Sequence, residues 1–166
     1  MKRPKFTRFS AAVHFIEGLE EWAVQRGARV YPEVIPAGAE KYPFVAIETN
    51  NVQVVDETKD SGPDRLEYDV TVTLMVKEHG KNSGQEIRNA LADEIVDLMD
   101  YTGGEHNGFR VRECRWSGAS PGYDEQRAAY YMEIGFTLSA IQPEAREEYS
   151  GRLGRFILGR SRLGTA

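Results

Sequence analysis

Histidine is the first residue type in this sequence that could do chemistry, because imidazole binds metals and transfers protons near neutral pH. His14 falls in a predicted helix, His79 in a turn and His106 in a loop. No second histidine follows any of them at the spacing of three or four residues that builds a metal site on a helix. We therefore predict three ordinary surface histidines, with no metal and no cofactor.

Acidic residues form two groups, and paired carboxylates can act as general acid and base. One group lies in residues 56–64, a segment of loop composition, and the other lies on the solvent side of a predicted helix. The groups consist of Asp56, Glu57, Asp60 and Asp64, and of Asp93, Glu94 and Asp97. Acid catalysis also needs a pocket, and no apolar residues accompany the loop group. We predict no enzyme; an apolar pocket holding a perturbed carboxylate would favour the alternative of a small hydrolase.

Two glycine-containing pairs resemble phosphate-binding loops only in part. Gly103-Gly104 leads into a predicted strand, whereas a phosphate loop opens a helix with its free backbone N–H groups. Ser83-Gly84 does open a predicted helix, but it lacks the lysine that follows in a phosphate loop. Neither pair predicts a nucleotide site.

A basic stretch with aromatic neighbours, residues 109–116, has a composition found in nucleic-acid-binding surfaces. Strict alternation along this predicted strand places Arg110 and Arg112 on the same face as Cys114 and Trp116. There the arginines can pair with acids of a neighbouring strand. Cys114 is the only cysteine of the chain, and we expect it to act as a small hydrophobic residue.

The net charge of −5 is unevenly distributed along the chain. Residues 1–8 carry four basic side chains and no acidic one, and so do residues 151–166, which leaves −13 for residues 9–150. An acidic body repels free DNA, although the arginine-rich ends keep a nucleic-acid-binding protein open as an alternative. Charged ends can also simply keep a surface solvated.

The elements that must position these residues belong to one domain, because 166 residues with 40% hydrophobic and 28% charged side chains suit a single globular domain. We expect a basic arm over residues 1–8, an α+β domain over residues 9–142 and a basic extension over residues 143–166. The apolar runs are too short to span a membrane, and the N-terminus shows no secretory signal. We therefore expect assembly in a host cytoplasm.

Hydrophobic periodicity predicts two helices and five strands. The first helix covers residues 10–25 and stops at Gly27, and the second covers residues 83–100 and begins with a capping box at Ser83. Strands are predicted over residues 30–34, 44–49, 66–76, 109–116 and 128–140. This order favours a mainly antiparallel sheet of about five strands with both amphipathic helices on one face.

The sheet face turned away from the helices is the candidate interface. Alternation places small and polar residues on it, among them Thr71, Thr73, Glu133 and Thr137. We predict that these residues contact another subunit. A solvated face has a similar composition in open antiparallel sheets, and that interpretation remains open.

The order of elements and two short runs suggest a family. An amphipathic helix is followed by a strand ending in Val30-Tyr31-Pro32, by the run Tyr42-Pro43-Phe44-Val45-Ala46-Ile47-Glu48, and then by a long alternating strand and a helix that starts with Ser-Gly-Gln-Glu. Over about residues 9–140 this arrangement resembles the tail terminator or tail completion proteins of long-tailed bacteriophages and related prophages.

The resemblance implies a structural virion protein of the tail or neck. Such a protein forms a ring, usually of six subunits, that caps the tail tube, stops its polymerisation and joins the tail to the neck of the head. Its partners would be copies of itself, the tail tube protein and a neck or connector protein, while DNA passes through the lumen without specific binding. A head-tail adaptor or stopper is the nearest alternative.

The C-terminal extension departs from the resemblance, so its role is inferred from its own residues. It alternates basic and apolar side chains, which suits docking on the acidic and apolar flank of the next subunit. The residues we expect to make this contact are Arg152, Leu153, Arg155, Phe156 and Ile157.

Overall fold

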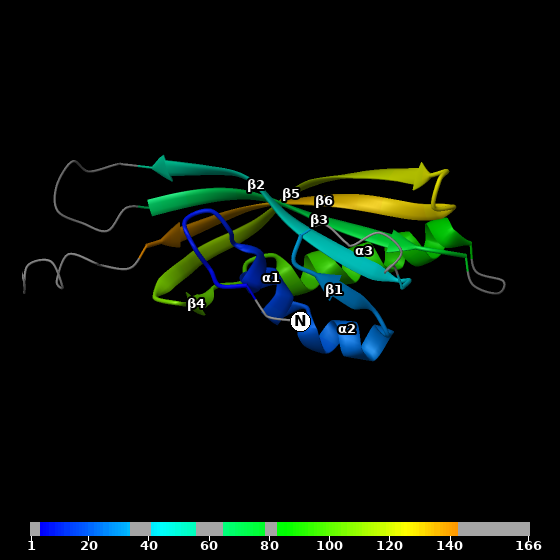
Figure 1. Cartoon of the computed structure of the whole chain (residues 1–166), viewed down its shortest axis with the longest axis horizontal. Helices are drawn as coiled ribbons and strands as arrows, with labels where there is room; N and C mark the ends of the chain where they lie inside the picture. Colours follow the sequence, from blue (N-terminus) through cyan, green and yellow to red (C-terminus); the bar gives the residue numbers. More distant parts are fainter. Residues whose placement is uncertain (1–3, 34–40, 56–64, 79–82, 143–166) are drawn as a thin grey trace, which may run out of the picture.

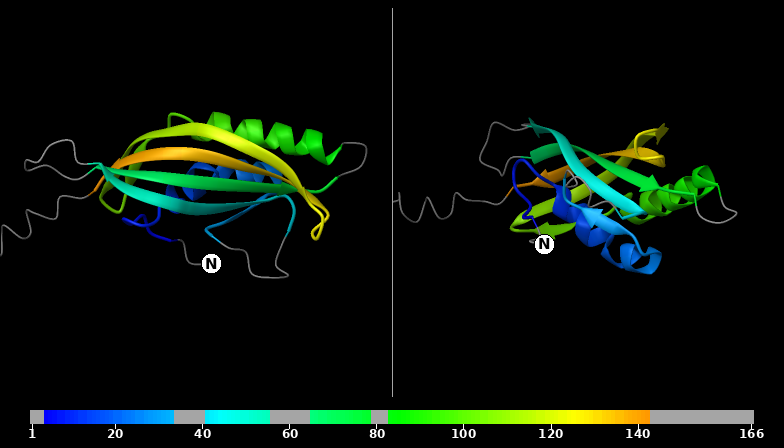
Figure 2. Two further views of the ribbon diagram at one scale, coloured as in Figure 1. Left: turned by 90° about the horizontal axis from the view of Figure 1, so that it is seen from above. Right: turned by 45° about the vertical axis from the view of Figure 1, so that its right-hand side comes forward.

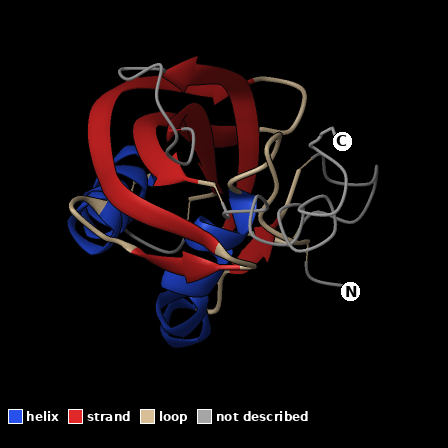
Figure 3. Cartoon of the chain, turned by 90° about the vertical axis from the view of Figure 1, so that its left-hand side faces the viewer, coloured by secondary structure: helices blue, strands red, loops and turns tan. Residues whose placement is uncertain are grey.

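The computed structural model describes residues 4–33, 41–55, 65–78 and 83–142. These residues form, in chain order, α1 (Ala12–Gly18), α2 (Glu20–Arg26), β1 (Arg29–Tyr31), β2 (Phe44–Val55), β3 (Arg65–Val76), α3 (Gly84–Met99), β4 (Gly104–His106), β5 (Phe109–Asp124) and β6 (Ala129–Ile141). The strands build one curled sheet, and the helices lie on one side of it (Figures 1 and 3). The predicted α+β class is confirmed.

The sheet has six strands in the order β1-β2-β3-β6-β5-β4. β1 pairs with β2 in parallel, and the other four pairings are antiparallel. The expectation of about five mainly antiparallel strands is thus correct in outline. It misses β4, whose sequence Gly-Glu-His offers no hydrophobic alternation, and it misses the parallel pairing of β1.

The first predicted helix is wrong as a single element, because the chain breaks it at Leu19. Leu19 has φ −101° and ψ 0°, outside the helical range, and it is both the C-cap residue of α1 and the N-cap residue of α2. Gly18 precedes the break and lies against Met99: a Cβ on Gly18 would come within 2.5 Å of the Met99 sulfur. A larger residue at this position would require the Met99 side chain to move. Gly27, with φ 65°, ends α2 as predicted.

The hydrophobic core fills the space between the helices and the sheet. Alternation in β3 and β6 points one side chain in two toward the helices, as predicted, so Val70, Val72, Ile134, Phe136 and Leu138 are buried. α1 adds Phe15 and α3 adds Ile95 from above this layer. Phe6 is also buried in this core, so part of the basic N-terminal segment packs on the domain.

β5 departs from strict alternation, and the prediction that Arg110 and Arg112 share a face with Cys114 is wrong. A register irregularity between Val111 and Glu113 places one extra residue in β5, so that Val111 and Cys114 are both buried on the helix side. A second irregularity follows between Trp116 and Gly118. The expectation that Cys114 acts as a small hydrophobic residue agrees with its complete burial.

Two antiparallel pairs give the sheet its length. β2 pairs with β3 from Phe44 to Val55, and β5 pairs with β6 as far as the Asp124–Ala129 pair, beyond the predicted strand end at Trp116. Figure 2 shows the four strands running side by side, with α3 across one face. No helix in the described ranges is both long and apolar enough to cross a membrane.

Candidate assembly interface

The face of the sheet that points away from the helices, called here the outer face, brings four predicted interface residues together. Thr71 and Thr73 alternate with the buried residues of β3, and Glu133 and Thr137 do so on β6. Thr73 lies directly opposite Glu133 in the antiparallel register, and Thr71 lies opposite Gly135, two residues along the strand. The three threonines are half-buried and Glu133 is exposed.

Glycine and threonine occupy the centre of the outer face. Gly135 lies under the neighbouring strand, since a Cβ on it would come within 3.0 Å of Ser117 Oγ. Thr71 accepts a short hydrogen bond from the Asn50 side-chain amide of β2. Each of the three threonines lies opposite a longer charged side chain, because Glu48 faces Thr71, Glu133 faces Thr73 and Arg115 faces Thr137 in the register.

Acidic side chains surround this centre on neighbouring strands. Residues at facing positions in the register extend the face from β2 across to β5. They include Glu48 on β2, Glu67 and Asp69 on β3, Glu133 on β6 and Glu113 on β5. Arg65, Arg110 and Arg115 also lie at outer-face positions of the register, so the outer face is mainly polar and carries both signs of charge.

One end of the outer face is apolar, although the sequence predicted small and polar residues on this face. Phe44, Met75 and Ala129 form a second buried cluster there, separate from the main core. Tyr31, Tyr42 and Tyr131 pack around it. These aromatic side chains close the face near β1 and the turn between β5 and β6.

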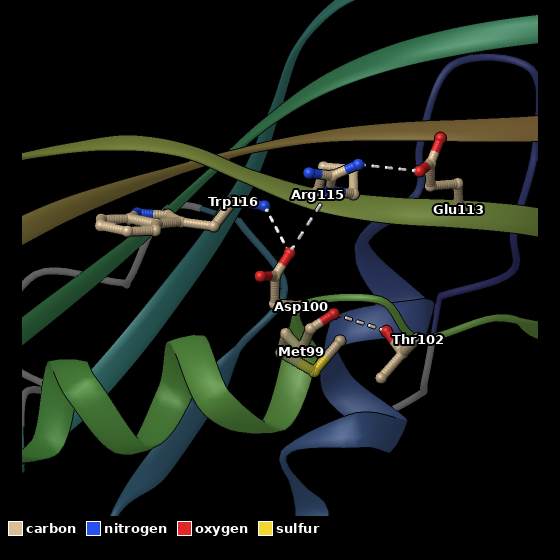
Figure 4. A network of polar contacts seen from close by, with 6 residues as sticks. All are labelled: Met99, Asp100, Thr102, Glu113, Arg115 and Trp116. Carbon is tan, nitrogen blue, oxygen red and sulfur yellow. Dashed lines mark hydrogen bonds and ion pairs between the residues drawn. The ribbon is translucent and has the colours of Figure 1, made fainter.

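A polar network holds the end of α3 against β5 (Figure 4). An Asp100 carboxylate oxygen accepts a hydrogen bond from the backbone N–H of Trp116 at 3.0 Å and lies 3.9 Å from Arg115 Nε. Arg115 also donates to Glu113 at 3.1 Å, and this hydrogen bond is the main reason why the pKa of the guanidinium is raised. The Arg115 guanidinium stacks 4.5 Å from the centre of the exposed Tyr101 ring.

Tyr101 has a backbone conformation unusual for its type. Its φ of 67° lies in the left-handed region, which costs a residue with a Cβ about 1 kcal/mol. Its N–H donates to the Cys114 carbonyl oxygen at 2.7 Å, so the turn is fixed by β5. The result is an aromatic side chain that is 70% exposed beside the network.

His14 and His106 contact each other, so the prediction of three ordinary surface histidines is wrong for these two. His14 Nδ1 lies 2.9 Å from His106 Nε2, and His14 itself is buried. His79 lies outside the described residues. His106 also stacks on Phe6, with 5.6 Å between ring centres, which ties the N-terminal segment to β4.

The hydrogen bonds around the histidine pair indicate which of the ring nitrogens carry a proton. The Thr102 hydroxyl donates to the Met99 carbonyl oxygen at 2.7 Å, so its oxygen is free to accept from His14 Nε2 at 3.0 Å. A neutral His14 then accepts at Nδ1 from His106 Nε2. His106 Nδ1 faces a Glu17 carboxylate oxygen at 3.2 Å, and a proton on that nitrogen makes the contact an ion pair. Burial, and to a lesser degree the neighbouring His106, lowers the pKa of His14 to about 4.

The pair is a structural connection rather than a metal site. It joins α1 to β4 and to the turn after α3, with each polar group satisfied within the cluster. Across the described parts of the chain, no group of three or more His, Cys, Asp or Glu side chains is arranged to hold a metal ion.

A groove opens between α3 and the sheet, and we call it the α3–β5 groove. Its volume is about 500 Å³. Its lining includes Ala92, Asp93 and Val96 of α3, Trp116 and Ala119 of β5, and Met132 of β6. Asp93 is the single carboxylate of this lining.

Several predicted site residues fall outside the described part of the chain. These are the C-terminal residues Arg152, Leu153, Arg155, Phe156 and Ile157, together with the acidic group of residues 56–64. Their expected roles stay predictions.

Comparison with known proteins adds a family and a fold. The family model described as tail completion protein gp17 matches residues 21–138 of this chain. A chain from a structure titled "Virion of native gene transfer agent (GTA) particle" superposes with a TM-score of 0.61 at 15% sequence identity, covering 80% of this chain and 95% of that one. That similarity shows a shared fold. No curated protein matches the sequence.

Proposed function

Because the chain belongs to the tail completion protein gp17 family, which makes it a structural protein of a phage tail, we propose that it is the tail terminator. In this proposal copies of the chain form a ring, usually of six subunits, on the end of the tail tube. The ring stops polymerisation of the tube protein and presents a surface to a neck or connector protein. The family is one of tail structure, not of catalysis.

The family match carries the proposal, and the outer face supports its geometry. A ring closes through a heterologous contact, in which one surface of each subunit meets a different surface of the next. Short threonine side chains at the centre of the outer face, Thr71, Thr73 and Thr137, would take part in such a contact together with the charged residues opposite them. Glu133, which is exposed beside Thr73, would lie at the rim and pair with a cation of the neighbour.

Charge supports passage of DNA through the ring. Residues 9–150 carry a net charge of −13. A negatively charged lumen repels the phosphate backbone, so DNA would pass without specific binding. The fold shared with a chain of a virion particle is consistent with assembly among virion proteins, at the level of fold.

Growth of tail tubes in the presence of the protein tests this proposal. Purified tube protein from the same phage or prophage is polymerised, and elongation is followed by light scattering with and without the full-length chain. We expect elongation to stop once the chain is present at about one ring per tube end. Unchanged elongation at a large excess of the chain would exclude a terminator and favour a head-tail adaptor or stopper.

A further inference from the structure

The α3–β5 groove is an apolar surface without an occupant among the described residues. Trp116 at its edge keeps 48% of its surface exposed, while Ile134 at its floor is fully buried. Met132 and Val96 contribute further apolar surface and are half-buried. Exposing a large indole beside a hollow of about 500 Å³ is unfavourable in water and is typical of a binding surface.

One side of the groove is acidic. Asp93 lines it, and Asp97 follows one helical turn later on the same side of α3. Glu86 precedes Asp93 by two turns. The single arginine of α3, Arg88, is buried and points to the Gly122 carbonyl oxygen and to Asn89. A basic and apolar segment would therefore suit the groove.

The chain itself contains such a segment. Residues 152–158 read Arg-Leu-Gly-Arg-Phe-Ile-Leu, with four apolar side chains for the hollow and two arginines for the acidic side. Arg160 and Arg162 follow, and residues 149–166 contain no acid. Apolar and charge complementarity thus agree for this one segment.

The position of the chain end indicates that the segment reaches another copy. β6 ends at Ile141, whereas the groove contacts it at Met132, nine residues earlier, or about 30 Å back along the strand. To enter its own groove the chain would have to reverse its direction after Gln142, and residues 143–151 would have to be almost fully extended to span that distance. A segment that leaves one end of a subunit, and a groove nearer the other end, suit the head-to-tail contacts of a ring.

We infer that the α3–β5 groove binds residues 152–158 of a second copy of this chain, with Phe156, Ile157 and Leu158 in the hollow and Arg155 beside Asp93. This inference rests on the proposed ring for the second copy, and it adds the receptor surface for the C-terminal segment.

Disulfide trapping in the full-length chain tests the inference. One variant combines Ala119→Cys, in the groove, with Leu158→Cys. The matched control combines Val24→Cys, on α2, with Leu158→Cys; Val24 is 80% exposed and is absent from the groove lining. The native Cys114 is buried, and burial raises its pKa to about 12, so it does not compete. Both variants are oxidised with glutathione and separated by denaturing gel without reductant, and ring assembly is checked by native mass measurement.

We expect the groove pair to form covalent oligomers at least tenfold faster than the control pair, because docking raises the local concentration of the two thiols. Adding Phe156→Asp and Ile157→Asp should reduce the rate to that of the control. If a ring assembles but the two pairs react equally fast, the groove inference is wrong and the ring stands. If the groove pair links only within single chains and no ring forms, the second copy and the ring are both wrong.

Salt dependence gives a second readout of the same contact. Charge reversal at Asp93→Lys should slow formation of the groove disulfide, and combining it with Arg155→Glu should restore the rate. Equal rates in the single and double variants would contradict the placement of Arg155 beside Asp93. The slowing by Asp93→Lys should shrink at 1 M salt, where charge interactions are screened within about 3 Å.

Discussion

At the scale of single residues, the contact between His14 and His106 connects α1 to β4 on the helix side of the sheet. His14 is buried and neutral, donates to Thr102 and accepts from His106. Its folded pKa of about 4 lies below the ordinary value of 6.5, so the folded state binds fewer protons than the unfolded state between these values. Stability is therefore fully present above pH 6.5 and is lost as the pH falls toward 4.

We expect His14→Gln to remove this part of the pH dependence. The shift corresponds to a loss on the order of 3 kcal/mol in the free energy of unfolding between pH 7 and pH 4. The variant should be less stable than the parent at pH 7, since it loses the bond to His106, but its stability should fall less steeply. Urea unfolding at pH 7, 6, 5 and 4 measures both slopes. Parallel curves for the two proteins would contradict the assigned role of His14.

The histidine pair could not be found from the sequence, because His14 and His106 are 92 residues apart and neither belongs to a motif. Glu17, three residues after His14, contacts His106 and not His14, and in this way completes the cluster. The positions of the outer-face threonines were predicted, because period-two alternation determines which side of a regular strand a residue faces. Alternation failed for Cys114, whose burial was expected from its residue type.

At the scale of elements, α3 begins where its sequence predicts. Ser83 Oγ accepts from the Glu86 backbone N–H at 3.1 Å, which satisfies one of the free donors of the first turn. The helix then carries Ala92, Ile95 and Met99 to the core and Asp93 to the groove.

Ser83→Ala should lower the free energy of unfolding by about 1 kcal/mol, because the cap is lost and the donor is left to water. The matched control is Ser120→Ala, an exposed serine of β5, which should change stability by less than about 0.5 kcal/mol. Chemical unfolding followed by circular dichroism measures the difference. Equal effects of the two substitutions would show that the cap does not contribute to stability.

Elements with regular periodicity were predicted well, and elements shaped by tertiary packing were not. β3 and β6 keep their alternation across the core. The buried side of α3 runs through Ala92, Ile95 and Met99, whereas Leu98, which helical periodicity places in the apolar stripe, is exposed. The break at Leu19 lies beside the packing of Gly18 on Met99, a contact between residues far apart in sequence. The irregularities in β5 likewise arise where the strand meets the end of α3, at the Asp100 and Tyr101 contacts.

At the scale of the whole molecule, the outer face and the C-terminal segment determine how the chain would assemble. Thr71 lies at the centre of the proposed contact, beside Gly135. Thr71→Trp should leave the fold intact, since tryptophan is compatible with a strand, but should prevent close approach of a second subunit. We expect loss of the ring in native mass measurements with an unchanged circular dichroism spectrum. The control Val24→Trp, at an exposed position of α2, should assemble normally. A ring in both variants would place the contact between subunits elsewhere.

Deletion of residues 143–166 should weaken the ring or its attachment to the tail tube. The deletion removes Leu153, Phe156 and Ile157 and the four arginines that follow Gly151. Oligomer mass and virion yield after complementation with the truncated chain measure the two effects. An unchanged ring together with an unchanged virion yield would remove any assembly role from this segment.

Electron microscopy of tail tubes mixed with the full-length chain tests the terminator proposal most directly, because it shows whether and where the chain binds. We expect a ring of the chain, with an open centre, on one end of each tube and no further growth from that end. Tubes whose ends stay bare, or chains bound along the tube wall, would contradict it.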